Sequence, residues 1–274
     1  IPRGQVSDVL WRQQKAAVEL PALLAPGAVS RAPRRPFPDS RLARDDLERI
    51  IAAKTVLPEF PDLTERFRRP DGTMSLRPIQ SEALKRIEVS GGLLGAVPVG
   101  RGKTLIALLA PAVLNAVRPL MLIPAALRAQ CLHDVEFYGQ HFNIPPILVR
   151  SYEELSTPER SGMLSVLVPD LLICDEAHKL RHFSSARVRR VVRYLRDHPD
   201  CHFVALSGTI TKGSIKDYAH LAAWALDEAS PLPLGDALLD AWRKAVESEE
   251  EDDRVANHWS IRGISTEEDP RAAL

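Results

Sequence analysis

A glycine-rich stretch at residues 97–104, VPVGRGKT, carries residue types that bind phosphate. Glycines at 100 and 102 let successive backbone N–H groups point at one anion, as they do at a helix N-terminus. Lys103 can reach the β- and γ-phosphates of a nucleotide, and Thr104 can offer a hydroxyl to Mg²⁺. The strict phosphate-loop pattern begins with glycine, whereas this stretch begins with valine. On its own, the stretch is equally compatible with a glycine-rich turn beside a surface lysine.

A second stretch at residues 171–178, LLICDEAH, reduces the weight of that alternative. Four apolar residues run directly into Asp175 and Glu176, which is typical of a buried strand that delivers acids at the ligand-binding edge of an α/β sheet. We expect Asp175 to hold Mg²⁺ and Glu176 to orient and deprotonate a water. Solvated acids at a strand end are the alternative. The order of the two stretches predicts an ATP–Mg²⁺ site with Glu176, Lys103 and Asp175 as its catalytic residues.

The surrounding sequence predicts elements that could position these side chains. From residue 77 onward, short apolar runs alternate with amphipathic windows, as in a parallel sheet with crossover helices. We expect strands at residues 93–97, 120–123, 146–149, 171–174 and 202–206. Helices are expected at residues 103–116, 127–137, 184–196 and 215–226. The predicted fold is α/β, a three-layer phosphate-loop domain with a mostly parallel sheet.

Regions with a different composition flank this predicted domain. Residues 21–38 contain five prolines, a density that breaks helices, and amphipathic windows at 6–20 and 41–54 lie on either side. We therefore expect a helical and proline-rich N-terminal extension over 1–72, the ATP-binding domain over 73–230, and an acidic C-terminal segment over 231–274. Because the chain opens with isoleucine, we expect a fragment or a processed product.

Six motifs in order make the chain resemble the first RecA-like domain of superfamily-two helicases and translocases, over about residues 76–226. LRPIQ (76–80) resembles the Q motif, VPVGRGKT motif I, IPAALRAQ (123–130) motif Ia, RSYEELS (150–156) motif Ib, DEAH (175–178) motif II and LSGTITKGS (206–214) motif III. That family accepts a small apolar residue at the start of motif I, so the valine is a mild departure. The LSGT form resembles Swi/Snf-like and phage-encoded translocases more than RNA helicases.

The resemblance implies a role for each matched residue. It implies that residues of the Q motif and motif I contact ATP, namely Arg77, Gln80, Val99, Gly100, Arg101, Gly102, Lys103 and Thr104. The Gln80 amide would then bond the edge of the adenine base. It implies that three residues couple the ATP state to motif III, namely His178, Ser207 and Thr209. It implies contacts to nucleic acid from motifs Ia and Ib, by Pro124, Arg128, Ser151 and Tyr152.

Plainer explanations remain for several of these residues. Ser207 and Thr209 could belong to an ordinary turn after a strand, and Tyr152 could be a packing residue. His178 and His182 stand four residues apart, a spacing compatible with zinc on a helix, although no third ligand is evident. We prefer the coupling role for His178.

The function predicted from these motifs is an ATP-dependent helicase or translocase domain that acts on double-stranded DNA, with ATP and Mg²⁺ as cofactors. Nothing after residue 226 resembles the motif that carries the arginine finger, so we expect a second RecA-like domain as partner and weak hydrolysis without it. A phosphate-loop kinase or signalling NTPase is one alternative, but motifs Ia, Ib and III have no role there. A pseudo-ATPase or assembly subunit that binds nucleotide without motor activity is the other.

The composition limits the partners. The chain has 36 basic and 36 acidic residues, so any contact with nucleic acid must come from a local basic face. The arginine-rich window at 181–198 could follow phosphates, but its apolar residues have helical spacing, which favours an amphipathic helix with a solvated basic face. The three cysteines of the chain lack the spacing of a metal site or a disulfide scaffold. The longest apolar run, 105–114, is too short to cross a bilayer. We expect a cytoplasmic protein of a bacterium or a phage-infected host cell, without membrane contact.

Overall fold

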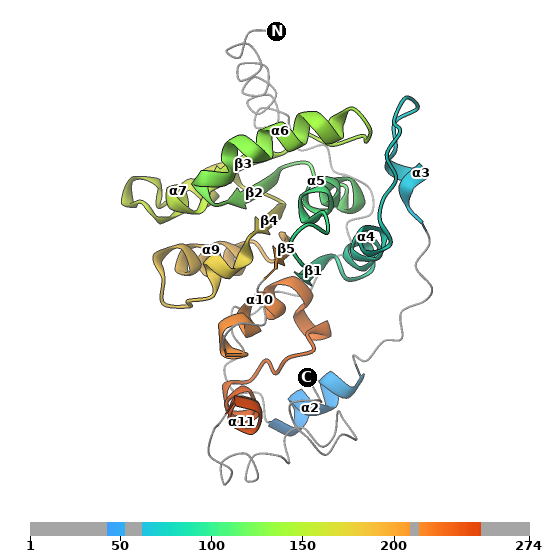
Figure 1. Cartoon of the computed structure of the whole chain (residues 1–274). Coiled ribbons are helices and arrows are strands. Elements are labelled where there is room, and N and C mark those ends of the chain that lie inside the picture. Colours follow the sequence, from blue (N-terminus) through green and yellow to red (C-terminus); the bar gives the residue numbers. More distant parts are fainter. Residues whose placement is uncertain (1–42, 53–61, 209–213, 248–274) are drawn as a thin grey trace.

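The computed structural model describes residues 43–52, 62–208 and 214–247. Five strands within these ranges form one sheet with the order β1-β5-β4-β2-β3, and all of its pairs are parallel (Figure 1). The strands are β1 (Gly92–Ala96), β2 (Pro119–Ile123), β3 (Leu148–Ser151), β4 (Leu171–Asp175) and β5 (His202–Ser207). The predicted α/β class with a mostly parallel sheet is confirmed.

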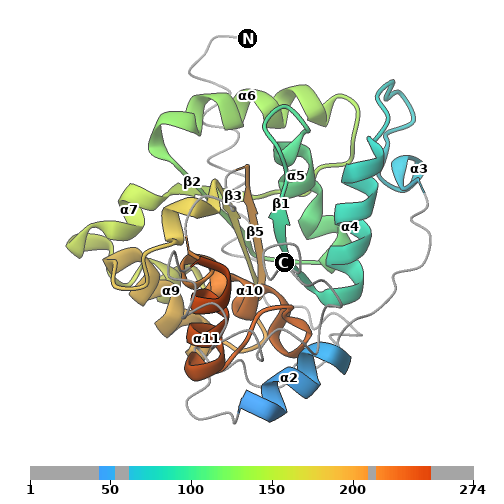
Figure 2. The same ribbon diagram turned by 60° about the horizontal axis from the view of Figure 1, so that its bottom comes forward.

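Helices cover both faces of this sheet, which gives the three predicted layers (Figure 2). One face packs against α4 (Pro78–Ser90), α5 (Lys103–Leu114) and α6 (Arg128–Gly139). The other face packs against α7 (Tyr152–Ser156), α8 (Met163–Leu167), α9 (Ala186–Asp197) and α10 (Lys216–Leu226). Shorter turns join them: α3 (Thr64–Phe67), η1 (Ala125–Leu127), η2 (Pro158–Arg160), η3 (Ala177–Leu180) and η4 (Asp227–Ala229).

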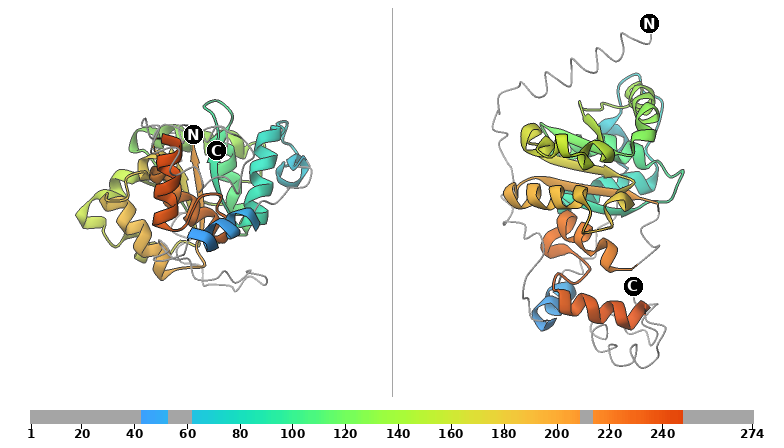
Figure 3. Two further views of the ribbon diagram at one scale, coloured as in Figure 1. Left: turned by 90° about the horizontal axis from the view of Figure 1, so that it is seen from below. Right: turned by 90° about the vertical axis from the view of Figure 1, so that its left-hand side faces the viewer.

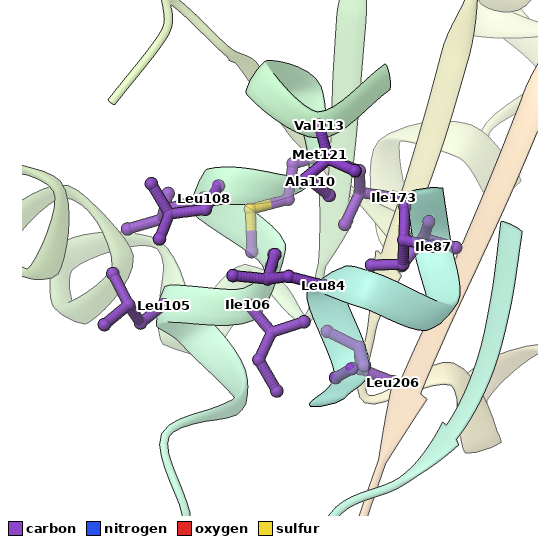
Figure 4. Packing of buried hydrophobic residues seen from close by; sticks show 14 of the residues in the cluster. Leu84, Ile87, Leu105, Ile106, Leu108, Ala110, Val113, Met121, Ile173 and Leu206 are labelled. Atoms are coloured by element: carbon purple, nitrogen blue, oxygen red, sulfur yellow. The ribbon is translucent and has the colours of Figure 1, made fainter. Parts of the chain in front are cut away.

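Side-chain alternation along the strands separates the two cores. In β4, Leu171 and Ile173 join the core beneath α4 and α5, whereas Leu172 and Cys174 face the core beneath α9 and α10. Helix α5 is apolar on nearly every side because it lies between α4 and the sheet, and Figure 4 shows its side chains interleaved with those of α4. This burial holds the first residue of α5 firmly against the ends of the strands.

The predicted strands all occur, but β3 lies two residues later than expected. The prediction placed it at 146–149, whereas the structure has Leu148–Ser151. Residue 146 is proline, which has no N–H to donate to β2, and the pairing of this edge strand with β2 begins at Leu148. As a result, motif Ib begins inside β3.

The outlying segments pack against the sheet domain and against each other. Phe67, from the predicted N-terminal extension, belongs to the core beneath α4. Helix α2 (Ala43–Ala52) packs against α11 (Asp236–Glu247), so the two predicted flanking regions meet beyond α10, as the right-hand view of Figure 3 shows. Ile50 contributes to this small core with Trp242. No helix within the described ranges is both long enough and apolar enough to span a membrane.

Candidate functional site

The glycine-rich loop lies between the end of β1 and the start of α5. Gly100 and Gly102 have φ angles of +78° and +82°, the left-handed region that glycine enters at least cost. A Cβ atom on Gly102 would lie 2.1 Å from the Gln80 side-chain nitrogen, whereas one on Gly100 would meet open space. The N-terminus of α5 has no side-chain cap, so its first N–H groups are free to bind an anion.

Two side chains from the start of α4 hold this loop in place. The Arg77 guanidinium donates to the Gly100 carbonyl at 2.7 Å, and Gln80 Nε2 donates to the Gly102 carbonyl at 3.2 Å. Gln80 Oε1 accepts the Arg77 backbone N–H at 2.8 Å, and the residue is only 4% exposed. Both ends of the amide therefore serve the protein backbone. The amide keeps a second N–H and a second lone pair, so its contact with adenine stays a prediction.

The two acids lie at the carboxyl end of β4, as predicted from the apolar run. Asp175 is the last residue of β4 and is buried, which raises the pKa of its carboxyl to about 6, with Glu176 adding to the effect. Asp175 Oδ1 accepts the Glu176 N–H at 3.0 Å. Glu176 itself has a φ angle of +53°, which is strained for a residue with a side chain.

The loop and the acids meet at the same edge of the sheet, because only β5 separates β1 from β4. Lys103, 9% exposed, places its Nζ 3.9 Å from Glu176 Oε1. His178 Nδ1 lies 3.1 Å from the other Glu176 oxygen and 3.4 Å from Ser207 Oγ. Residues from motifs I, II and III therefore form one continuous set of polar contacts.

The remaining predicted ATP contacts lie on the open side of the loop. Val99 is 82% exposed, Arg101 is also exposed, and Thr104 is half-buried. Gly208 was missed by the sequence reasoning: a Cβ atom there would lie 3.4 Å from Lys103 Nζ and 3.3 Å from Val99. Gly208 lies beside the glycine-rich loop because β5, which it follows, pairs with β1, and this pairing cannot be inferred from a short motif. Thr209 lies outside the described residues.

The residues predicted to contact nucleic acid fall into two classes. Pro124 is half-buried and Arg128 is exposed, so both are accessible. Ser151 is buried and caps α7 by accepting the Glu154 N–H at 3.1 Å. Tyr152 is fully buried and donates its hydroxyl to the Asp175 carbonyl at 2.8 Å. Both hydroxyls bond within the protein and both residues are buried, so the structure lends no support to their predicted contacts with nucleic acid.

The donor set suits Mg²⁺ bound together with a nucleotide. Within the ranges that the structure describes, no three His, Cys, Asp or Glu side chains cluster as a metal cage would require. Mg²⁺ needs no such cage, since it is usually held by one or two carboxylates plus substrate phosphates. Asp175 and Thr104 supply oxygens beside the N-terminus of α5. The residues present therefore fit the predicted ATP–Mg²⁺ pair.

An apolar groove of about 590 Å³ lies elsewhere, along β1 between α4 and η4. Its lining includes Ile79, Leu93 and Pro231 but none of the predicted site residues. The candidate site is instead an open, polar edge formed by loop backbone and charged side chains. Such an edge suits a phosphate group better than an apolar ligand.

Comparisons with known proteins find one weak structural similarity. No protein-family model matches the chain. Among solved structures, the chain is similar to the SWI2/SNF2 ATPase core of Sulfolobus solfataricus in complex with dsDNA, with 17% sequence identity and a TM-score of 0.46. The match covers 57% of this chain and 36% of that one, so the chain spans about a third of the length of the structure it matches. Similarity at this level does not show what this chain binds.

Proposed function

We propose that this chain is an ATP-binding and ATP-hydrolysing domain of a nucleic-acid-dependent motor that moves on double-stranded DNA. One observation carries the proposal: Lys103, Glu176, His178 and Ser207 come from three separate motifs and form consecutive contacts of 3.9, 3.1 and 3.4 Å at one edge of the sheet. A glycine-rich surface turn would not gather these groups. Their convergence supports a built hydrolytic site.

Each residue has a distinct part in the proposed reaction. The N–H groups at the start of α5 and Lys103 bind phosphate oxygens, and Thr104 with Asp175 holds Mg²⁺. The metal ion neutralises negative charge on the phosphates. Glu176 orients a water and accepts its proton. Because Lys103 and His178 contact different oxygens of Glu176, they hold the carboxylate at the mouth of the site.

The nucleic-acid side of the proposal rests on the accessible motif Ia residues. Exposed Arg128 at the start of α6 can contact a phosphate, and Pro124 precedes it in the same loop. A second RecA-like domain would supply the arginine finger and the rest of the nucleic-acid path. Without that finger, we expect turnover slower by about three orders of magnitude or more.

Nucleotide titration followed by hydrolysis assays tests this proposal. We expect the 274-residue chain to bind ATP–Mg²⁺, to hydrolyse it slowly, and to gain DNA-stimulated turnover when joined to a second RecA-like domain. Binding without hydrolysis in that extended protein would favour a pseudo-ATPase or assembly subunit. Full DNA-stimulated rates from the isolated chain would contradict the two-domain mechanism.

A further inference from the structure

A buried tyrosine reaches the peptide that joins the two acids. Tyr152 is the first residue of α7, is fully buried, and donates its hydroxyl to the Asp175 carbonyl at 2.8 Å. Burial raises the pKa of the Tyr152 phenol well above its usual value, so the hydroxyl keeps its proton and acts as a donor. None of the roles proposed above uses this contact.

The same peptide is held from its other side. Its carbonyl belongs to Asp175 and its N–H to Glu176, and that N–H donates to Asp175 Oδ1 at 3.0 Å. Glu176 then adopts a φ angle of +53°, a conformation that costs about 1–3 kcal/mol for a residue with a side chain. A conformation of that kind persists only where surrounding contacts fix it. The Tyr152 hydroxyl is one such contact.

Tyr152 is itself anchored from several directions. Ser151 and Glu154 form a reciprocal cap at the start of α7, with bonds of 3.1 and 2.9 Å. Glu153 accepts the Ala125 N–H at 2.9 Å, which ties α7 to the loop that follows β2. The phenol ring packs in the core beneath α9 and α10. The hydroxyl is therefore a fixed donor rather than a rotating one.

We propose that Tyr152 is a positioning residue that fixes the Asp175–Glu176 peptide and so aims the Glu176 carboxylate at the reacting water. The inference rests on the proposed hydrolytic function for its effect on rate. The effect on the Asp175–Glu176 peptide is independent of that function, because hydrogen exchange can be measured without nucleotide.

The chain offers a matched control at the opposite end of the same strand. Tyr194 is also buried, at 3% exposed, and donates its hydroxyl to the Pro169 carbonyl at 2.7 Å, two residues before β4 begins. Tyr152→Phe and Tyr194→Phe each remove one buried phenol-to-carbonyl bond. They differ in which end of β4 loses it.

The experiment compares the two variants with wild type in amide hydrogen exchange and in single-turnover hydrolysis, with the protein in excess over ATP. In Tyr152→Phe we expect the Glu176 amide to exchange about tenfold faster, the net value of one such bond. We expect hydrolysis to slow about tenfold with unchanged ATP affinity, as misplacement of a catalytic group does. Tyr194→Phe should change neither quantity, although it should lower the melting temperature by about as much as Tyr152→Phe does.

Two results would overturn the inference. One is unchanged exchange at Glu176 in Tyr152→Phe. The other is an equal loss of hydrolysis in both variants, which would mean that only general stability matters. If wild type shows no hydrolysis at all, the proposed function fails, yet the exchange comparison still decides whether Tyr152 fixes the peptide.

Discussion

Two clusters of charged residues in this molecule use their hydrogen bonds differently. Beyond the sheet, the buried Asp46 carboxylate accepts Arg49 Nε at 2.9 Å and the Leu234 and Gly235 N–H groups at 2.6 and 2.7 Å. Arg49 also donates to three carbonyls, those of Glu228, Ser230 and Leu232. At the sheet edge, by contrast, Lys103 has its nearest acid at 3.9 Å.

The difference distinguishes a cluster that stabilises the fold from a site that could bind a ligand. In the Asp46–Arg49 cluster, each charge is matched by close donors and acceptors, so the cluster holds α2 against the turn before α11. At the site, burial and the neighbouring Glu176 carboxylate raise the pKa of Asp175 to about 6, and Lys103 offsets this only in part. Such a site can accept a cation and a phosphate without first breaking strong internal bonds. We infer that charged groups with few close partners mark the proposed binding site.

The largest effect is expected from the catalytic carboxylate. Glu176→Gln removes the proposed base with little change in shape, so hydrolysis should fall about a thousandfold while ATP binding persists. Single-turnover assays and nucleotide titration measure the two quantities. Glu82→Gln, which alters an acid paired with Arg86 on α4, is the control and should leave hydrolysis unchanged. Unimpaired hydrolysis in Glu176→Gln would remove Glu176 from the mechanism.

The second effect concerns the satisfied cluster. Arg49→Met leaves the buried Asp46 charge without its partner, which should lower the free energy of unfolding by about 4 kcal/mol. Denaturant unfolding measures this loss, and hydrogen exchange should place it in α2 and α11. ATP affinity should not change. A variant as stable as wild type would show that the bonds around Arg49 contribute nothing net.

A third effect depends on pH. His220 is buried and bonds the Leu180 carbonyl at 2.8 Å, and burial lowers its pKa from 6.5 to about 4. The unfolded chain therefore binds the proton first as pH falls, so stability decreases between about pH 6.5 and 4, by up to about 3 kcal/mol. Unfolding curves at several pH values measure the loss. In His220→Gln, which retains a donor but does not titrate, the decrease should be smaller, and an identical pH profile would contradict this assignment.

The smallest effect tests whether Gln80 supports the loop or reads the base. Because its amide bonds loop backbone, Gln80→Ala should weaken ATP and GTP equally, by about tenfold, through loss of one support for the loop. Competition titrations measure both affinities. Gln130→Ala, which removes an exposed amide paired with Asp134, is the control. A loss confined to ATP would favour the base-reading role that the sequence suggested.

The sequence predicted best where the chemistry is local. Lys103 follows its glycines directly, and Asp175 and Glu176 directly end an apolar run, so the sheet edge could be inferred before its geometry was known. The bond from the Tyr152 hydroxyl to the Asp175 carbonyl could not, because it depends on how β3, β4 and α9 pack together. The Asp46 cluster was also missed. Its partners lie about 190 residues away in the chain, and no short pattern connects them.

The most direct measurement of the central claim is the affinity of the wild-type chain for a fluorescent ATP analogue with Mg²⁺, compared with that of Lys103→Ala. We expect wild type to bind and Lys103→Ala to bind about a hundredfold more weakly, because the variant loses a charged donor to phosphate. Lys179→Ala, which removes an exposed lysine in η3, should bind like wild type. Equal affinity of Lys103→Ala and wild type would contradict the account.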